Sequence, residues 1–303
     1  MELKPLTPLD YPAYKKYFIN QPYHLCGYSL SSIIAWQNFD YQAMAGIWKD
    51  TLIVAAEFRK NKSKRHLILP IAPPEVFPPE KLARIAGNLD YGEYWFVPQS
   101  YLDLHGRDIV EVYFDVEHQQ GYDDYIYLTS DLADLKGNKY SNKRNLIKQF
   151  NRTYTEASRV EMGPITPENL EECLEFLEKW CEKRDCDADP EADLACEKVA
   201  AINTLTNMEL YEVNTLMLRI DGVVSAFGIS AFLTSQMATL QYEKAYDHVK
   251  GLYQYFDNQC AKLLFKGYTY INKESDMGSE GLAMAKKSYH PIHMVESFRL
   301  ILK

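Results

Sequence analysis

The sequence has no long run of apolar residues. No stretch approaches the roughly 18–20 apolar residues that a helix needs to cross a bilayer. The first residues, Met1 to Asp10, also lack the basic and then apolar order of a secretory signal peptide. The sequence therefore predicts a cytoplasmic protein without a membrane span.

Paired cysteines are lacking as well. The chain has six cysteines, and none of them forms the C-x-x-C pair that is typical of structural zinc sites. Four lie between Cys173 and Cys196 without such spacing. We predict no metal site and interpret the cysteines as reduced thiols that mostly pack on helix faces.

Positive charge is scarce overall but locally concentrated. The chain has 33 lysines and arginines against 42 aspartates and glutamates, a net charge of −9 that argues against a general nucleic-acid coat protein. Six basic residues and no acidic one lie between Lys136 and Arg152, whereas twelve acidic and three basic residues lie between Glu168 and Glu197. The acidic segment carries the whole excess, so the basic segment is a local field that attracts phosphate.

The basic segment has two interpretations. If it is helical, Lys143, Arg144, Lys148 and Arg152 lie mostly on one side and form a phosphate-binding stripe. Alternatively, it is a solvated helix face that pairs with the acidic segment. The charge pattern alone leaves both open.

Length and composition indicate a folded protein of two domains. With 47% hydrophobic and 25% charged residues, the 303-residue chain is globular and about twice the ~150-residue length of an average domain. Glycine and proline residues at 163–167 punctuate the chain. We predict a first domain over residues 1–155, which ends in the basic helical connector, and a second over 156–303.

The second domain shows an ordered series of elements. Apolar residues over 170–181 follow the spacing of one helix face, and alternation around Asp221-Gly222 predicts an antiparallel meander over 216–220, 223–232 and 237–245. A helix over 252–267, a strand over 268–272, a short helix capped by Ser279 and a strand over 292–300 follow. This order resembles the layout of a GNAT-type N-acyltransferase.

The first domain contains similar elements. Strand-like runs occur at 48–58, 66–71, 108–117 and 124–128, and a short helix is predicted from Pro79 to Asn88. A diverged second copy of the same unit fits this content. The predicted fold class is therefore α/β (α+β), a tandem GNAT-like acyltransferase fold with two mixed sheets flanked by helices.

A glycine-bearing turn near the end of the chain is a candidate site. The strand over 268–272 leads to Asn272 and Asp276, and a helix that begins after Ser279 offers free backbone N–H groups near Gly278 and Gly281. Two glycines alone are a weak motif, which a simple strand-to-helix turn also explains.

Two blocks of the sequence resemble one known family. The residues from Asn272 to Leu282 with those from Lys286 to Pro291, and the basic block from Lys139 to Phe150, resemble the phosphatidylglycerol lysyltransferase C-terminal domain family. Its members resemble tandem-GNAT aminoacyltransferases. The resemblance implies transfer of an aminoacyl group from aminoacyl-tRNA, in characterised relatives to a lipid headgroup or a peptidoglycan precursor.

The resemblance also bears on the donor. GNAT proteins that use coenzyme A carry the pattern Q/R-x-x-G-x-G/A before the pyrophosphate-binding helix, whereas the segment from Tyr246 to Gln254 has the single glycine Gly251. We therefore expect aminoacyl-tRNA as the donor, with tRNA as a partner, no resident cofactor, and coenzyme A as the less favoured donor. The expected acceptor is a small molecule, a peptide or a lipid headgroup.

Aminoacyl transfer requires an acceptor held against an activated ester, a base, and stabilisation of an oxyanion. We predict Glu243 and Asp276 as catalytic carboxylates; for Glu243, a solvent-facing strand residue is the alternative. The predicted substrate- and phosphate-binding residues are Lys143, Arg144, Asn145, Lys148, Arg152, Asn272, Gly278, Gly281, Lys286, Lys287 and Tyr289.

Two other functions stay open beside this transferase. One is a coenzyme-A-dependent N-acyltransferase. The other is a catalytically silent module that keeps the fold and the basic stripe to bind RNA or a phosphorylated ligand. No arrangement of serine or cysteine with histidine supports nucleophilic catalysis.

Overall fold

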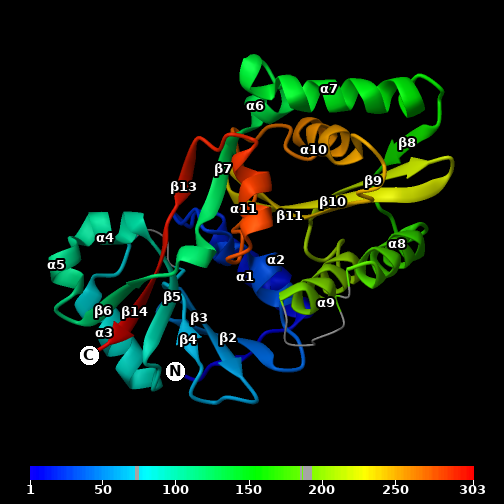
Figure 1. Cartoon of the computed structure of the whole chain (residues 1–303). Coiled ribbons are helices and arrows are strands. Elements are labelled where there is room, and N and C mark those ends of the chain that lie inside the picture. Colours follow the sequence, from blue (N-terminus) through cyan, green and yellow to red (C-terminus); the bar gives the residue numbers. More distant parts are fainter. Residues whose placement is uncertain (72–74, 185, 187–192) are drawn as a thin grey trace.

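Two mixed β-sheets form the centre of the molecule, and helices lie on their faces (Figure 1). The computed structural model describes residues 1–71, 75–184, 186 and 193–303. The predicted α/β fold class, two mixed sheets flanked by helices, is confirmed.

The first sheet has the strand order β1-β2-β3-β4-β5-β14-β6. Its strands are β1 (Lys4–Pro5), β2 (Tyr41–Trp48), β3 (Thr51–Phe58), β4 (His66–Leu67), β5 (Glu93–Pro98), β14 (Ser297–Leu302) and β6 (Phe114–His118). The helices of this part are α1 (Tyr11–Phe18), α2 (Leu30–Ala35), α3 (Pro79–Leu89), α4 (Gln99–His105) and α5 (Arg107–Val110).

Three predictions for this part need correction. The run at 66–71 is a regular strand only over β4, His66–Leu67. The run at 48–58 contains a hairpin turn at Lys49-Asp50, where both residues adopt the left-handed conformation, so β3 begins only at Thr51. The run at 108–117 begins as helix α5 and not as a strand. Gly106, with φ of 81°, precedes this helix, and the backbone carbonyl of Gly106 accepts the N–H of Val110. The helix predicted from Pro79 is confirmed as α3.

The second sheet has the order β13-β7-β12-β11-β10-β9-β8. Its strands are β13 (His293–Val295), β7 (Asp124–Leu128), β12 (Tyr270–Asn272), β11 (Met237–Ala245), β10 (Val223–Thr234), β9 (Asn214–Ile220) and β8 (Val160–Gly163). The helices of this part are α6 (Thr129–Asp134), α7 (Ser141–Phe150), the π-helical turn Asn151–Thr155, α8 (Leu170–Glu182), α9 (Asp193–Thr206), α10 (Leu252–Leu263) and α11 (Glu280–Lys287).

The predicted GNAT-type order is present in this second sheet. β9, β10 and β11 form an antiparallel meander, and β12 returns parallel to β11 after α10. α7 and α10 cover one face of the sheet, while α8 and α9 cover the other (Figure 1). The short helix capped by Ser279 is also confirmed, since the Ser279 hydroxyl accepts the N–H of Leu282.

The two sheets exchange strands. β7 comes from the first 155 residues but lies in the second sheet between β12 and β13, and β14, at the end of the chain, lies in the first sheet between β5 and β6. The final strand predicted over 292–300 is in fact two strands, which Glu296 separates because the chain passes there from one sheet to the other. The division at residue 155 stays a prediction. Each predicted domain contributes one strand to the sheet that is formed mainly by the other.

Gly251 fixes the close approach of α10 to α7. Its φ is 82°, and a Cβ atom placed on it would lie 2.3 Å from the carbonyl oxygen of Leu146 in α7. We expect Gly251→Ala to destabilise the fold by about 1–3 kcal/mol, because the backbone clash adds to left-handed strain. Urea unfolding measures this change. Gly267 also has a positive φ, but the space around it is open, so Gly267→Ala should lower the free energy of unfolding by less. Equal losses in the two variants would argue against the clash.

Candidate active site

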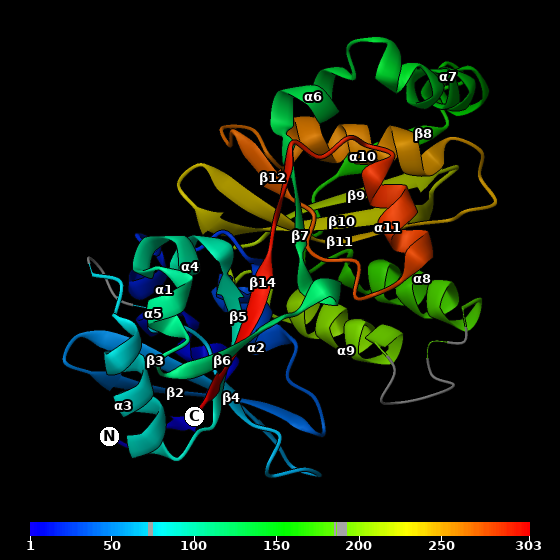
Figure 2. The same ribbon diagram turned by 60° about the vertical axis from the view of Figure 1, so that its left-hand side comes forward.

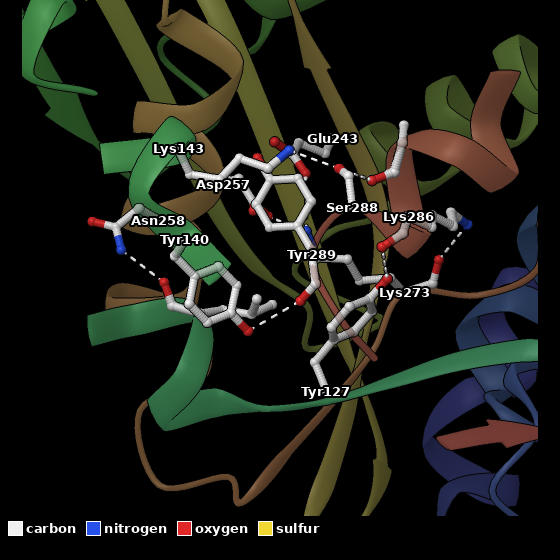
Figure 3. A network of polar contacts seen from close by, with 12 residues as sticks. Tyr127, Tyr140, Lys143, Glu243, Asp257, Asn258, Lys273, Lys286, Ser288 and Tyr289 are labelled. Carbon is white, nitrogen blue, oxygen red and sulfur yellow. Dashed lines mark hydrogen bonds and ion pairs between the residues drawn. The ribbon is translucent and has the colours of Figure 1, made fainter. Parts of the chain in front are cut away.

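A buried cluster of charged residues lies where β11, α10 and the end of β12 meet. β11 contributes Glu243, α10 contributes Asp257, and Lys273 directly follows β12 (Figure 3). Lys273 Nζ forms an ion pair with Asp257 and lies 3.7 Å from Glu243 Oε2. The side chains of Lys273 and Asp257 are only 9% and 4% exposed, so water screens this pair little.

A β-bulge in β11 turns Glu243 toward α10. Ile229 of β10 pairs with Tyr242 and Ser230 pairs with Leu240, so Gln241 is the additional residue. Such a residue shifts the alternation of side chains along the strand. Leu240 packs in the core beneath α10, whereas Tyr242 packs in the core beneath α8 and α9. Glu243 is therefore not the solvent-facing strand residue that the sequence allowed as an alternative.

The cluster perturbs the acid–base behaviour of its members. Burial raises the pKa of Glu243 far above that of an ordinary glutamate, and the nearby Asp257 carboxylate adds to this effect. Burial alone would lower the pKa of Lys273, but the two carboxylates outweigh it and raise that pKa. Lys273 therefore stays charged, while Glu243 is prepared to hold or release a proton.

Tyr289 and Lys143 complete one side of the cluster. The Tyr289 ring lies between two ammonium groups, with Lys143 Nζ 3.7 Å and Lys273 Nζ 4.8 Å from its centroid (Figure 3). Lys143 Nζ, from α7, also donates to Ser288 Oγ at 2.7 Å. Burial lowers the pKa of Lys143 and raises that of the Tyr289 hydroxyl. Two cations and two carboxylates thus surround one aromatic ring.

Tyrosine hydroxyls hold the end of α11 and the segment that follows it in place. Tyr140 donates to the backbone carbonyl of Tyr289 at 3.1 Å, and Tyr127 donates to that of Lys286 at 2.8 Å. The side-chain ammonium of Lys286 donates to the backbone carbonyls of residues 273, 274 and 275 at 2.5, 3.1 and 2.6 Å. Lys286 thereby fixes the turn that follows β12 and carries Lys273.

Asp276 and the glycines of the turn lie apart from this cluster. Asp276 accepts a hydrogen bond from the Tyr125 hydroxyl at 2.5 Å and from the backbone N–H of Gly278 at 2.9 Å. Gly278 has φ of 77°, and Gly281 is exposed in the first turn of α11. In the described part of the chain, Asp276 has no hydrogen bond or ion pair to Glu243. Its role as a second catalytic carboxylate stays a prediction.

Asn272 joins the second sheet to the N-terminal segment around His24 and Cys26. Its side-chain amide donates to the backbone carbonyl of His24 at 2.8 Å and to Asp124 Oδ2 at 2.7 Å. The same Asp124 oxygen accepts the backbone N–H of Cys26 at 2.5 Å, and Oδ1 accepts the Cys26 thiol at 3.4 Å. These contacts tie the N-terminal segment to β7 and β12.

Asp124 offers a test of pH-dependent stability. Burial raises its pKa from 3.8 to about 6, so the native state holds a proton that the unfolded state releases between these values, and the stability contribution of this group falls as pH rises. Asp124→Asn keeps an acceptor for Cys26 and Asn272. We expect urea unfolding to show the variant about 1–3 kcal/mol more stable than wild type at pH 7.5 and nearly equal at pH 4. A variant less stable by the same amount at both pH values would contradict this.

The basic residues predicted as a stripe divide into two groups. Lys143 points into the cluster, and Arg144 donates to the backbone carbonyls of Leu135 and Gly137, where it caps the end of α6. Asn145, Lys148 and Arg152 are exposed, and their side chains have no hydrogen bond or ion pair within the described ranges. The same holds for the side chain of Lys287 on α11.

The predicted alternative, pairing of the basic with the acidic segment, is not seen among the described residues. α8 and α9 lie on the opposite face of the sheet from α7 (Figure 1). Their acids pair elsewhere: Glu172 with Arg219, Glu178 with Lys198, and Glu197 with Lys244. The exposed cations of α7 therefore form no ion pairs with these three acids.

Sequence analysis missed Asp257 and Lys273. A signal was present for Asp257, since it stands on the packed face of its helix with Cys260 and Ala261, where a charged residue is unusual.

Among the described residues, no group of three or more histidine, cysteine or acidic side chains could hold a metal ion. No helix in the described part of the chain is long and apolar enough to cross a membrane.

Comparisons with known proteins place the chain among related folds. The family model "Phosphatidylglycerol lysyltransferase, C-terminal" matches residues 98–301. A conserved protein of unknown function from Bacteroides thetaiotaomicron is similar over 100% of both chains, with 28% identity and a TM-score of 0.88. The C-terminal domain of a putative lysylphosphatidylglycerol synthetase from Agrobacterium fabrum has 13% identity and a TM-score of 0.61, over 87% of this chain and 84% of that one. The comparison with curated proteins gave no match.

Proposed function

Because the chain belongs to the phosphatidylglycerol lysyltransferase C-terminal family, we propose that it transfers an aminoacyl group from aminoacyl-tRNA to an amine or hydroxyl acceptor. The family and the fold support an acyltransferase-type function. The observation that carries the finer proposal is the buried cluster of Glu243, Asp257 and Lys273.

Glu243 serves as the general base in this reaction. The acceptor nitrogen or oxygen attacks the ester carbonyl carbon, the bond from that carbon to the ribose oxygen breaks, and the acceptor proton passes through Glu243 to the leaving ribose oxygen. A carboxylate with a raised pKa can both take and return a proton near neutral pH. The ammonium groups of Lys273 and Lys143 stabilise the oxyanion that develops on the carbonyl oxygen.

The start of α10 favours tRNA over coenzyme A as the donor. Gly251 precedes this helix, and its Cα lies against the carbonyl of Leu146, so a negatively polarised group of α7 lies beside the helix N-terminus. A pyrophosphate there would meet this carbonyl rather than a glycine-rich loop of free N–H groups. A lipid headgroup is the acceptor class that the family suggests.

A transfer assay tests the proposal. The purified chain is mixed with tRNA that carries a radiolabelled amino acid and with vesicles containing phosphatidylglycerol, and in a parallel arm with soluble primary amines. The expected result is label in the lipid or amine fraction. Label transfer from acetyl-coenzyme A instead would support the N-acyltransferase alternative, and tRNA binding without transfer would support the silent module.

Lys148 and Arg152 are the expected tRNA contacts, since they are exposed and free among the described residues. Reversing both to glutamate should weaken tRNA binding at low salt at least about tenfold and reduce the slope of log affinity against log salt by roughly 0.7–0.9 for each lost phosphate contact. Filter binding measures both quantities. The control Lys4→Glu with Lys62→Glu makes the same charge change at two exposed sites, one in β1 and one in the connector between β3 and β4. An equal loss of affinity in this control would contradict a local site.

A further inference from the structure

A cavity of about 740 Å³ lies in the first part of the chain, at the turn between β2 and β3 and along α3. Figure 2 shows α3 beside these strands, at the opposite end of the molecule from α7 and α10. The volume of the cavity falls within the roughly 300–1,000 Å³ of typical small-molecule sites. The residues that line it come from residues 1–89, so it is separate from the Glu243 cluster.

Two aromatic rings form the apolar side of this cavity. Trp48 and Phe77 meet edge to face, with centroids 6.3 Å apart. Lys81 Nζ lies 3.2 Å from the Phe77 centroid and 5.6 Å from that of Trp48, and Lys49 Nζ lies 5.2 Å from the Trp48 centroid. An indole flanked by two ammonium groups offers both a stacking surface and positive charge.

The positive charge of the cavity is not neutralised by the described residues. Lys81 and Arg84 stand three residues apart on α3, on the face that lines the cavity, and neither forms an ion pair in the described ranges; nor does Lys49. Glu75 also lines the cavity but forms no ion pair there. Three cations and one carboxylate therefore give the lining a net positive charge, in a chain whose overall net charge is −9.

Thr51 adds a polar side chain to the lining of the cavity, and the residue is 5% exposed. Its hydroxyl can donate a hydrogen bond to a ligand in the cavity or accept one from it.

We propose that this cavity binds a small aromatic anion, whose flat ring stacks on Trp48 and whose phosphate or carboxylate group is held by Lys49, Lys81 and Arg84. The inference does not depend on the proposed transferase reaction, since no residue is shared with the Glu243 cluster. A ring without a charge, or an anion without a ring, uses only half of the lining and binds more weakly.

Calorimetric titration of the full chain tests this proposal with AMP, phenyl phosphate and benzoate. At least one of the three should bind saturably below about 5 mM, and adenosine and inorganic phosphate should each bind at least about tenfold more weakly than the best of them. Phenyl phosphate against benzoate distinguishes a phosphate from a carboxylate ligand, and AMP against phenyl phosphate reports the size of the ring. If none of the three binds, the proposal is wrong.

Variants locate the binding. Arg84→Gln and Lys81→Gln should each weaken the best ligand at least about fivefold, whereas Lys4→Gln, an exposed lysine outside the cavity, should leave its affinity unchanged. Ligand-induced quenching of tryptophan fluorescence should disappear in Trp48→Phe. Melting temperatures close to wild type verify folding, and unchanged affinity in folded Arg84→Gln and Lys81→Gln would overturn the assignment.

Discussion

Replacing Glu243 with glutamine is expected to lower the rate of acyl transfer by about 10²–10⁴-fold, the usual contribution of a general base. The amide keeps the size of the carboxyl group and stays within reach of Lys273, but it cannot accept a proton. The chain itself should stay folded, because Asp257 remains to balance the Lys273 charge. The measurement is single-turnover transfer of labelled aminoacyl groups to the acceptor that the wild type uses.

The pH profile separates a proton-transfer role from a structural one. Since burial and Asp257 raise the pKa of Glu243, the wild-type rate should increase with pH through the neutral range as this group loses its proton. Glu243→Gln should show a low rate without this increase. Glu161→Gln, an exposed glutamate on β8, is the matched control and should behave as wild type. A variant at position 243 with near-normal rate would remove Glu243 from the mechanism.

Replacing Asp257 with alanine is expected to destabilise the fold by about 3–5 kcal/mol, because it leaves the buried Lys273 ammonium without its closest counter-ion. Glu243, at 3.7 Å, compensates only in part. Urea unfolding at pH 7.5 measures the loss. Adding Lys273→Met to Asp257→Ala should recover part of it, since the second change removes the uncompensated charge.

The exposed pair of Asp115 and Lys303 is the comparison for this loss. Their side chains are 68% and 46% exposed and their charged atoms lie 3.6 Å apart. Asp115→Ala should therefore cost no more than about 1 kcal/mol. Equal losses at the two aspartates, or no recovery in the double variant, would show that Asp257 stabilises the fold by packing rather than by charge.

Local signals were sufficient to predict most of the second sheet. The turn at Asp221-Gly222 and the alternation on both sides of it gave the meander, and Ser279 gave the start of α11. These elements depend on neighbours in the sequence. The prediction of one continuous final strand was wrong at Glu296. The alternation of apolar residues continues through this position, although the chain passes there from one sheet to the other.

The candidate site was only partly predictable, because it depends on contacts between distant segments. Glu243 faces α10 only through the bulge at Gln241, which simple alternation along a strand does not reveal. Lys143 looked like one member of a surface stripe, yet it packs on the Tyr289 ring, a residue that is 146 positions further along the chain. Charge patterning identified where cations concentrate but not which of them turn inward.

Because of the exchange of β7 and β14, a cut at residue 155 would separate each of these strands from the sheet that it completes. A fragment that begins there would lack β7 and leave the pairing edges of β12 and β13 open, and the complementary fragment would lack β14 between β5 and β6. Open strand edges invite association with other chains. The segment from 98 to 301 that matches the family contains β7 and most of β14. Replacing one half of the chain by that of a relative would therefore disturb both sheets.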